Sequence, residues 1–168
     1  MTAPLDRPPL APAGVAFVLS GLGYHAAQRF RERLAPLGLA PRHVGVLTAL
    51  ASAEGMSQHA LGQHLEIPPS RMVALVDELE ARGLVERRRN PADRRAYALA
   101  LTDAGRRVLE QVAALADEHE RQLCAALDAE ERETLLRLLR RIAAQQGLPQ
   151  RVHPSLAASD RAGPPPAC

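Results

Sequence analysis

Arginine is concentrated in one short segment of this 168-residue chain. Residues 82–107 contain eight arginines and three acidic residues, a local net charge of +5, whereas the whole chain has a net charge of +2. Residues 108–135 reverse the balance, with eight acidic residues and two arginines. A basic patch attracts polyanions, because each phosphate that it neutralises releases condensed counterions. The segment therefore indicates nucleic-acid binding.

Two strand patterns with a turn between them present these arginines. The segment from Leu84 to Thr102 has this pattern, and its turn lies around Asn90-Pro91. In the second strand Tyr97, Leu99 and Leu101 alternate with alanines, which predicts one buried face. An arginine at the tip of such a hairpin can enter a minor groove. The hairpin residues that we expect at a DNA interface, with Asp93 orienting a tip arginine, are Arg88, Arg89, Asp93, Arg94 and Arg95.

Two short helical patterns with a tight break between them precede the hairpin. Ser57 is a suitable N-cap for the first helix, and Pro68-Pro69 forces the chain to restart as the second. Met72, Leu75, Val76 and Leu79 have helical spacing and are expected to be buried. The amino-terminal residues left exposed, which in a helix-turn-helix protein enter the major groove, are Pro69, Ser70, Arg71, Val73 and Ala74.

The order of these patterns predicts a mainly α fold with a small β-hairpin wing, a winged helix-turn-helix with a helical dimerisation region from both termini. Residues 1–13 read as a flexible arm and residues 147–168 as a disordered tail, because both are rich in proline and lack apolar periodicity. Residues 14–146 form one domain. Its reading head covers about 40–102, and its dimerisation helices cover about 14–35, 103–126 and 129–146.

The chain resembles the MarR family of bacterial transcriptional regulators over about residues 15–146. The matching pieces are Leu37-Gly38-Leu39, Val46-Leu47, Ser57-Gln58, Pro69-Ser70, Leu75-Val76-Asp77, Leu79-Glu80, Gly83-Leu84-Val85, Asp93-Arg94-Arg95, Leu101-Thr102 and Gly105. The resemblance implies a homodimer that binds a near-palindromic operator in double-stranded DNA, most often as a repressor. It also implies release by a small phenolic or otherwise aromatic ligand, in a groove lined by Tyr24, His25, Arg42 and His43.

Two long amphipathic patterns support a dimer independently of the resemblance. In the first, apolar residues from Leu109 to Leu127 recur at intervals of three and four, and Leu135, Leu138, Leu139 and Ile142 continue the period in the second. We expect these helices to share no core with the reading head, so that a second copy must cover them. Two-fold symmetry would set the two recognition helices roughly 34 Å apart.

Several other functions are compatible with parts of the sequence. Residues 15–20 followed by Gly21 and Gly23 mimic a strand leading into a dinucleotide fingerprint, which would make the chain a small nucleotide-binding oxidoreductase. The arginines would also suit a non-specific nucleoid protein, and His119 with His25 or His43 could bind zinc.

The remaining expectations concern compartment and cofactors. We expect no cofactor, no metal and no enzymatic activity. Cys124 and Cys168 are too few for a disulfide framework and neither is placed for peroxide sensing, and the apolar run at 15–19 is too short to span a membrane. The expected location is therefore the cytoplasm, in association with the nucleoid.

Overall fold

The computed structural model describes residues 14–89 and 97–148 of the chain. The elements in order are α1 (Val15–Leu34), the 3₁₀ helix η1 (Ala35–Leu37), α2 (Pro41–Ser52), α3 (Gln58–His64), α4 (Pro69–Ala81), β1 (Val85–Arg89), β2 (Tyr97–Leu101), α5 (Asp103–Leu123) and α6 (Ala129–Gln145). The fold is mainly α with one β-hairpin, as the sequence predicts. The predicted arm at 1–13 and residues 149–168 of the predicted tail lie outside the described residues.

Hydroxyl and carboxylate side chains cap the helices that the sequence pattern places. The Ser57 hydroxyl accepts a hydrogen bond from the Ala60 N–H at 3.1 Å, and the Thr102 hydroxyl accepts one from the Gly105 N–H at 3.0 Å. Asp128 and Glu131 form the reciprocal capping box of α6. These bonds satisfy amide groups that a helix start would otherwise leave without partners.

The hydrophobic core lies mainly in the reading head, and the end of α1 and the start of α5 contribute to it. Its largest fully buried apolar side chains are Leu34, Val46, Leu47, Leu50, Leu61, Met72, Val76, Leu79, Val85, Leu99 and Leu101. Val112 of α5 is also in this core, and a Cβ at Gly105 would collide with the Leu84 carbonyl oxygen. The expectation that the long helices share no core with the head is therefore wrong for the first turns of α5, because Gly105 lets that helix approach the backbone closely.

The hairpin pairs β1 with β2 in antiparallel register, from Val85 opposite Leu101 to Arg89 opposite Tyr97. The other edge of β2 is paired as well, since Leu99 donates its N–H to the Met56 carbonyl at 2.8 Å and accepts from the Gly55 N–H at 3.1 Å. The prediction of one buried face is wrong for both faces of β2. Tyr97 is 55% exposed at the turn end of the hairpin, while Ala98 and Ala100 on the opposite face are buried.

The alanine face of β2 is buried because larger side chains cover it. Ala98 and Ala100 lie opposite Arg88 and Glu86, and residues paired across a ladder share a face. The long stems of Arg88 and Glu86 can shield the small alanines while their charged ends stay in solvent. The sheet therefore has two covered faces, although the sequence alternation suggests one.

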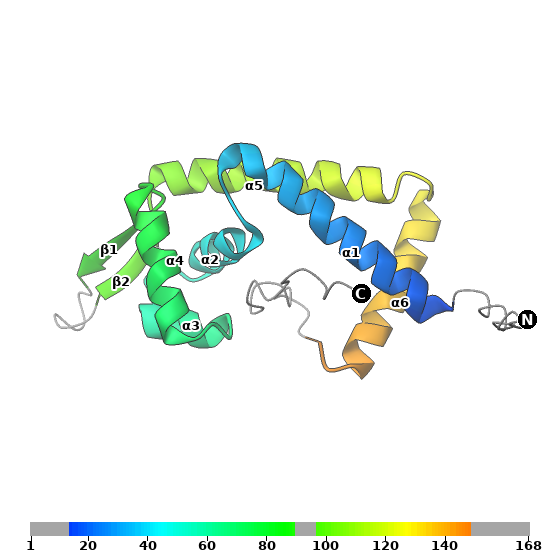
Figure 1. Ribbon diagram of the computed structural model, residues 1–168, viewed down its shortest axis with the longest axis horizontal. Coiled ribbons are helices and arrows are strands. Elements are labelled where there is room, and N and C mark those ends of the chain that lie inside the picture. The colour runs from blue at the N-terminus through cyan, green and yellow to red at the C-terminus, as the bar shows by residue number, and fades with distance from the viewer. Residues whose placement is uncertain (1–13, 90–96, 149–168) are drawn as a thin grey trace, which may run out of the picture.

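Figure 1 shows the reading head at one end of α5 and α6 at the other. The helix α1 runs back along α5, and the Phe30 and His119 rings meet there at a centroid distance of 5.5 Å. All of α6 is described and none of its residues is buried. Gly147, with φ of 68°, ends α6, and Leu148 donates its N–H to the Ala143 carbonyl at 3.0 Å. The predicted disordered tail therefore starts too early, because these two residues form the helix cap.

Among residues 14–89 and 97–148, no single helix is both long enough and apolar enough to cross a membrane. The bent pair 15–37 and 41–52, with an angle of 77° between its halves, passes on length and composition.

Candidate nucleic-acid interface

The amino-terminal half of α4 presents the residues predicted for the major groove. Pro69, Ser70, Arg71, Val73 and Ala74 are all exposed, and the positions between and after them that the sequence assigns to the core are buried. The helix starts at Pro69, which suits a first position because proline lacks the N–H that would have no partner there. The exposed strip therefore combines small side chains, one arginine and the positive end of a helix dipole.

A tight turn fixes α4 against α3. Glu66 has φ of 54°, a left-handed conformation that few residues other than glycine adopt, and Ile67 donates its N–H to the Gly62 carbonyl at 2.9 Å. A Cβ at Gly62 would lie 3.2 Å from the Ile67 carbonyl oxygen, so glycine permits this close approach. The two helices are thereby held as one unit.

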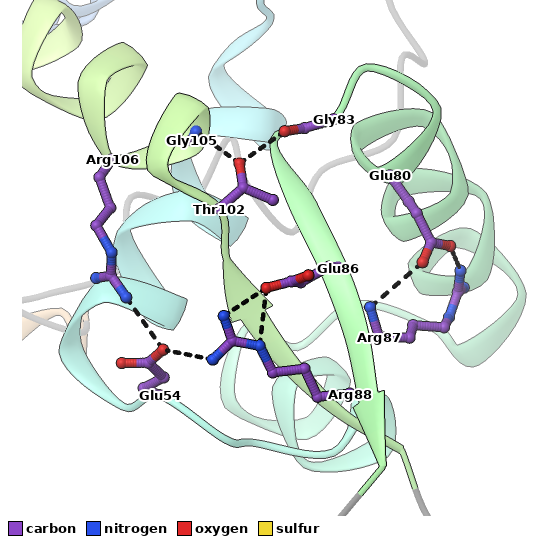
Figure 2. Close-up of polar contacts among 9 residues, drawn as sticks. All are labelled: Glu54, Glu80, Gly83, Glu86, Arg87, Arg88, Thr102, Gly105 and Arg106. Carbon is purple, nitrogen blue, oxygen red and sulfur yellow. Dashed lines mark hydrogen bonds and ion pairs between the residues drawn. The ribbon is translucent and has the colours of Figure 1, made fainter.

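The charged side chains of β1 alternate between two environments. Glu86 and Arg88 point to one side of the strand in Figure 2, toward Glu54, and Arg87 points to the other, toward α4. Successive side chains of a strand point to opposite faces, so Glu86 and Arg88 lie on one face of β1 and Arg87 lies on the other. The face on which each arginine lies decides which protein groups surround it.

Arg88 is exposed, as expected of a DNA contact, but its guanidinium already has carboxylate partners. It lies 2.5 Å from Glu86 and 3.7 Å from Glu54, and Glu54 in turn lies 3.0 Å from Arg106 at the start of α5. Exposed ion pairs of this kind contribute about 0.2–1 kcal/mol. Arg88 can therefore exchange its carboxylates for phosphate at small cost.

Of the remaining predicted wing residues, one lies within the described part of the chain and three lie outside it. Arg89, the last residue of β1, is exposed. Asp93, Arg94 and Arg95 lie outside the described residues. Their contacts with DNA stay predictions from the sequence.

Arg87 is the wing residue that the sequence analysis did not assign. Its guanidinium lies 2.5 Å from Asp77, 3.1 Å from the Gln58 side-chain oxygen and close to Glu80, so it connects β1 with both α3 and α4. Burial alone would lower the pKa of Arg87, but the hydrogen bonds and ion pairs with Asp77 and Glu80 raise it. Arg87 and Arg88 are successive residues of a predicted strand, and this alternation could have indicated that their side chains lie on opposite faces.

Arg82 and His43 tie α4 to the segment that leads out of α1. Arg82 donates to the carbonyl oxygens of Leu37 and Gly38, each at 2.7 Å. The His43 ring nitrogen Nδ1 accepts the Ala40 N–H at 3.0 Å, and Nε2 lies 3.1 Å from the Glu78 carboxylate. Two independent contacts thus anchor α4 to residues 37–43, one to the end of η1 and one to the start of α2.

His43 is one of the four residues predicted for the ligand groove. The residue is only 2% exposed, and the two bonds just described occupy both ring nitrogens. Burial lowers the pKa of His43, and the hydrogen bond with Glu78 offsets part of this shift. As the third residue of α2, His43 caps the Ala40 amide, and its place in the ligand groove stays a prediction.

The other three predicted groove residues lie on two helices. Tyr24, which is 74% exposed, and His25 lie near the middle of α1, and Arg42 is at the start of α2. Helical rise places Tyr24 roughly 15 Å along α1 from Leu34, where the chain turns toward α2. Their role in ligand binding stays a prediction.

The structure removes one alternative function. Residues 15–34 form one continuous helix, and Gly21 and Gly23 lie exposed within it. A dinucleotide fingerprint requires a strand before its glycines, so the nucleotide-binding alternative is wrong for this segment. Across residues 14–89 and 97–148, no three histidine, cysteine or acidic side chains are grouped so that they could hold a metal ion.

Comparison with known proteins places this geometry among DNA-binding regulators. The family model described as the MarR family matches residues 37–96, which contain α2, α3, α4 and β1. A protein of Thauera aromatica, named as the provisional transcriptional regulatory protein for the hcr operon, is 34% identical over 105 residues. The match covers 62% of this chain and 63% of that protein. The chain therefore spans slightly less than two thirds of the length of the Thauera aromatica protein.

Two solved structures of the regulator CouR are also similar. The transcriptional repressor CouR bound to a 23-mer DNA duplex is 35% identical with a TM-score of 0.67, over 77% of this chain and 92% of that one. CouR from Rhodococcus jostii RHA1 bound to p-coumaroyl-CoA is 31% identical with a TM-score of 0.65, over 83% of this chain and 95% of that one.

Proposed function

This chain belongs to the MarR family of transcriptional regulators, and from that premise we propose that it represses transcription as a homodimer bound to a near-palindromic operator. The observation that carries the proposal is the exposed amino-terminal half of α4. Ser70, Val73 and Ala74 share one helix face with no bulky side chain among them, so this face can approach base edges in a major groove. Arg71 beside them is long enough to reach a guanine.

The wing supplies a second set of contacts under this proposal. Arg88 and Arg89 are exposed on β1, and the sequence places Arg94 and Arg95 at the tip of the same hairpin. Contacts of arginine with phosphate fix the register of a protein on the duplex without reading its sequence. We assign base recognition to α4 and backbone contacts to the wing, with Asp93 orienting a tip arginine.

A second copy of the chain is the proposed cover for the apolar surfaces that the single chain leaves open. The large exposed hydrophobic side chains of α1 and α6 are Val15, Phe17, Val18, Leu19, Leu22, Tyr24, Leu135, Leu136, Leu138 and Ile142. Apolar surface of this extent on helices outside the head favours a protein interface. Sedimentation at micromolar concentration tests this, and a monomer would contradict it.

The proposed effector is a small phenolic or otherwise aromatic acid. CouR has been solved with p-coumaroyl-CoA, and the groove candidates in this chain are Tyr24, His25, Arg42 and His43. An arginine beside an imidazole could receive a carboxylate or phenolate. If a panel of such acids leaves operator binding unchanged, the effector proposal fails while the DNA-binding proposal stands.

The proposed site of action is the nucleoid in the cytoplasm, and the experiment that tests the function is a DNA selection. Full-length protein is used to select duplexes from a random library, and the enriched duplex then competes with random duplex of equal length. A specific regulator is expected to prefer its operator by a factor of about 10³ or more. Equal affinity for both duplexes would instead show the non-specific nucleoid protein that the arginine content also allows.

A further inference from the structure

Two carboxylates of α4 lie beyond the residues proposed for the major groove, toward the carboxyl end of the helix. Asp77 comes seven residues after Ser70 and four after Val73, so it lies on the same helix face as the groove-reading residues. It is 57% exposed, and Glu80 follows it by one turn. An acidic side chain on this face would repel phosphate, because like charges facing each other across an interface are costly.

Arg87 is placed to cancel that repulsion. Its guanidinium is only 25% exposed at the side chain and lies between Asp77 and Glu80, which are both on α4. The Arg87 backbone N–H also points to Glu80, at 3.3 Å. The cation therefore sits against α4, on the side of β1 away from Arg88.

We propose that Arg87 is a positioning residue that acts as the internal counter-ion of the recognition helix, and that it strengthens DNA binding without touching DNA. It neutralises Asp77 and Glu80 and, through Gln58, holds α4 and α3 against the wing. This inference rests on the proposed DNA-binding function. It separates Arg87 from its neighbours Arg88 and Arg89, whose exposed guanidinium groups we assign to phosphate.

A cycle of charge-neutralising substitutions tests the proposal. Binding is measured on the duplex that the wild-type full-length protein selects. Arg87→Gln exposes both carboxylates and should weaken binding about tenfold at low salt, because α4 then approaches phosphate with unpaired negative charge. Adding Asp77→Asn to Arg87→Gln should recover most of that loss. The dependence of log K on log salt should become shallower in Arg87→Gln, because salt screens the repulsion, and should return to the wild-type slope in the double variant, because no phosphate contact is removed.

A direct phosphate contact or a purely structural role for Arg87 would also weaken binding by Arg87→Gln, but each gives a different pattern. If Arg87 contacts phosphate, the slope falls by about one and Asp77→Asn restores nothing. If Arg87 serves only to hold the fold together, the double variant, which lacks both ends of the ion pair, binds no better than the single one. Either outcome overturns the inference.

A second variant keeps the test decisive if Arg87→Gln does not fold. Arg87→Lys retains the charge but loses the forked geometry, so it should bind within about threefold of wild type if charge neutralisation is the main effect. A loss of about tenfold, as large as that expected of Arg87→Gln, would contradict the proposal. Failure of the wild-type protein to select any duplex would overturn the DNA-binding function itself, which is a distinguishable result.

Discussion

At the scale of the residue, the exposed positions of α4 follow from their spacing. A helix that buries Met72, Leu75, Val76 and Leu79 must leave the intervening side chains outside, and the structure confirms this division. Spacing along the chain does not predict which partner each exposed charged side chain contacts. Arg87 and Arg88 are identical in type and adjacent in sequence, yet one is held by α4 and the other by Glu54 and Glu86.

Arg71 is expected to read a base. Arg71→Ala should lower the affinity for the selected operator by about 1–3 kcal/mol and relax the preference at one base pair, because a bidentate contact with guanine is lost. Binding titrations against single-base variants of the operator measure this. Arg121→Ala is the control, because it removes an exposed arginine from α5, outside the head. A uniform loss on every sequence would assign Arg71 to phosphate instead.

His43 is expected to make stability depend on pH. Its pKa in the folded protein is lowered from 6.5 by burial, so the unfolded chain binds a proton first. The free energy of unfolding is therefore undiminished above pH 6.5 and falls as the pH decreases below it. A protonated ring would also turn a donor toward the Ala40 N–H, which now donates to it.

Urea denaturation between pH 7.5 and 5.5 measures this effect. The decrease in stability on acidification should be smaller in His43→Gln than in wild type. Burial lowers the pKa of His119 as well, so His119 can also contribute to the pH dependence of stability. Denaturation of His119→Gln over the same pH range separates its contribution from that of His43. If wild type and His43→Gln lose equal stability over this range, His43 is not the group responsible.

At the scale of the element, the helices and the hairpin were predictable and the sheet environment was not. Ser57 and Pro68-Pro69 marked where α3 and α4 begin, because a local hydrogen bond and the proline ring decide those points. The pairing of Met56 with the outer edge of β2 is a non-local contact between segments far apart in sequence. The burial of Ala98 and the exposure of Tyr97 depend on such contacts and therefore had to be observed.

The network that joins β1 to α5 is expected to restrain the wing. Glu54 bridges Arg88 on β1 and Arg106 on α5, and Glu86 also holds Arg88. Glu86→Gln should release Arg88 and strengthen DNA binding by up to about fivefold, the equivalent of one exposed ion pair. The salt dependence should become steeper as Arg88 gains a phosphate contact.

Titrations of operator binding at several salt concentrations check this prediction. Glu118→Gln provides the control, because Glu118 pairs with Arg121 on α5, in a helical i, i+3 pair outside the head. Weaker binding by Glu86→Gln would show that the network supports the wing and does not compete with DNA for Arg88.

At the scale of the whole molecule, the reading head has a complete core and the long helices do not. The sequence predicted amphipathic helices at both ends of the chain, and the exposed apolar side chains of α1 and α6 agree with surfaces that need a cover. Which copy or segment covers them could not be read from one chain. In the proposed dimer the heads project from a shared helical base, which fixes the spacing of the two recognition helices.

The spacing and the groove assignment are tested together by a dimethyl sulfate footprint on the selected operator. This reagent attacks guanine in the major groove and adenine in the minor groove. We predict protected guanines in two major-groove segments whose centres lie about one helical turn apart, with protected adenines beside them where the wings lie. Protection confined to the minor groove, or a single protected half-site, would contradict recognition by paired α4 helices.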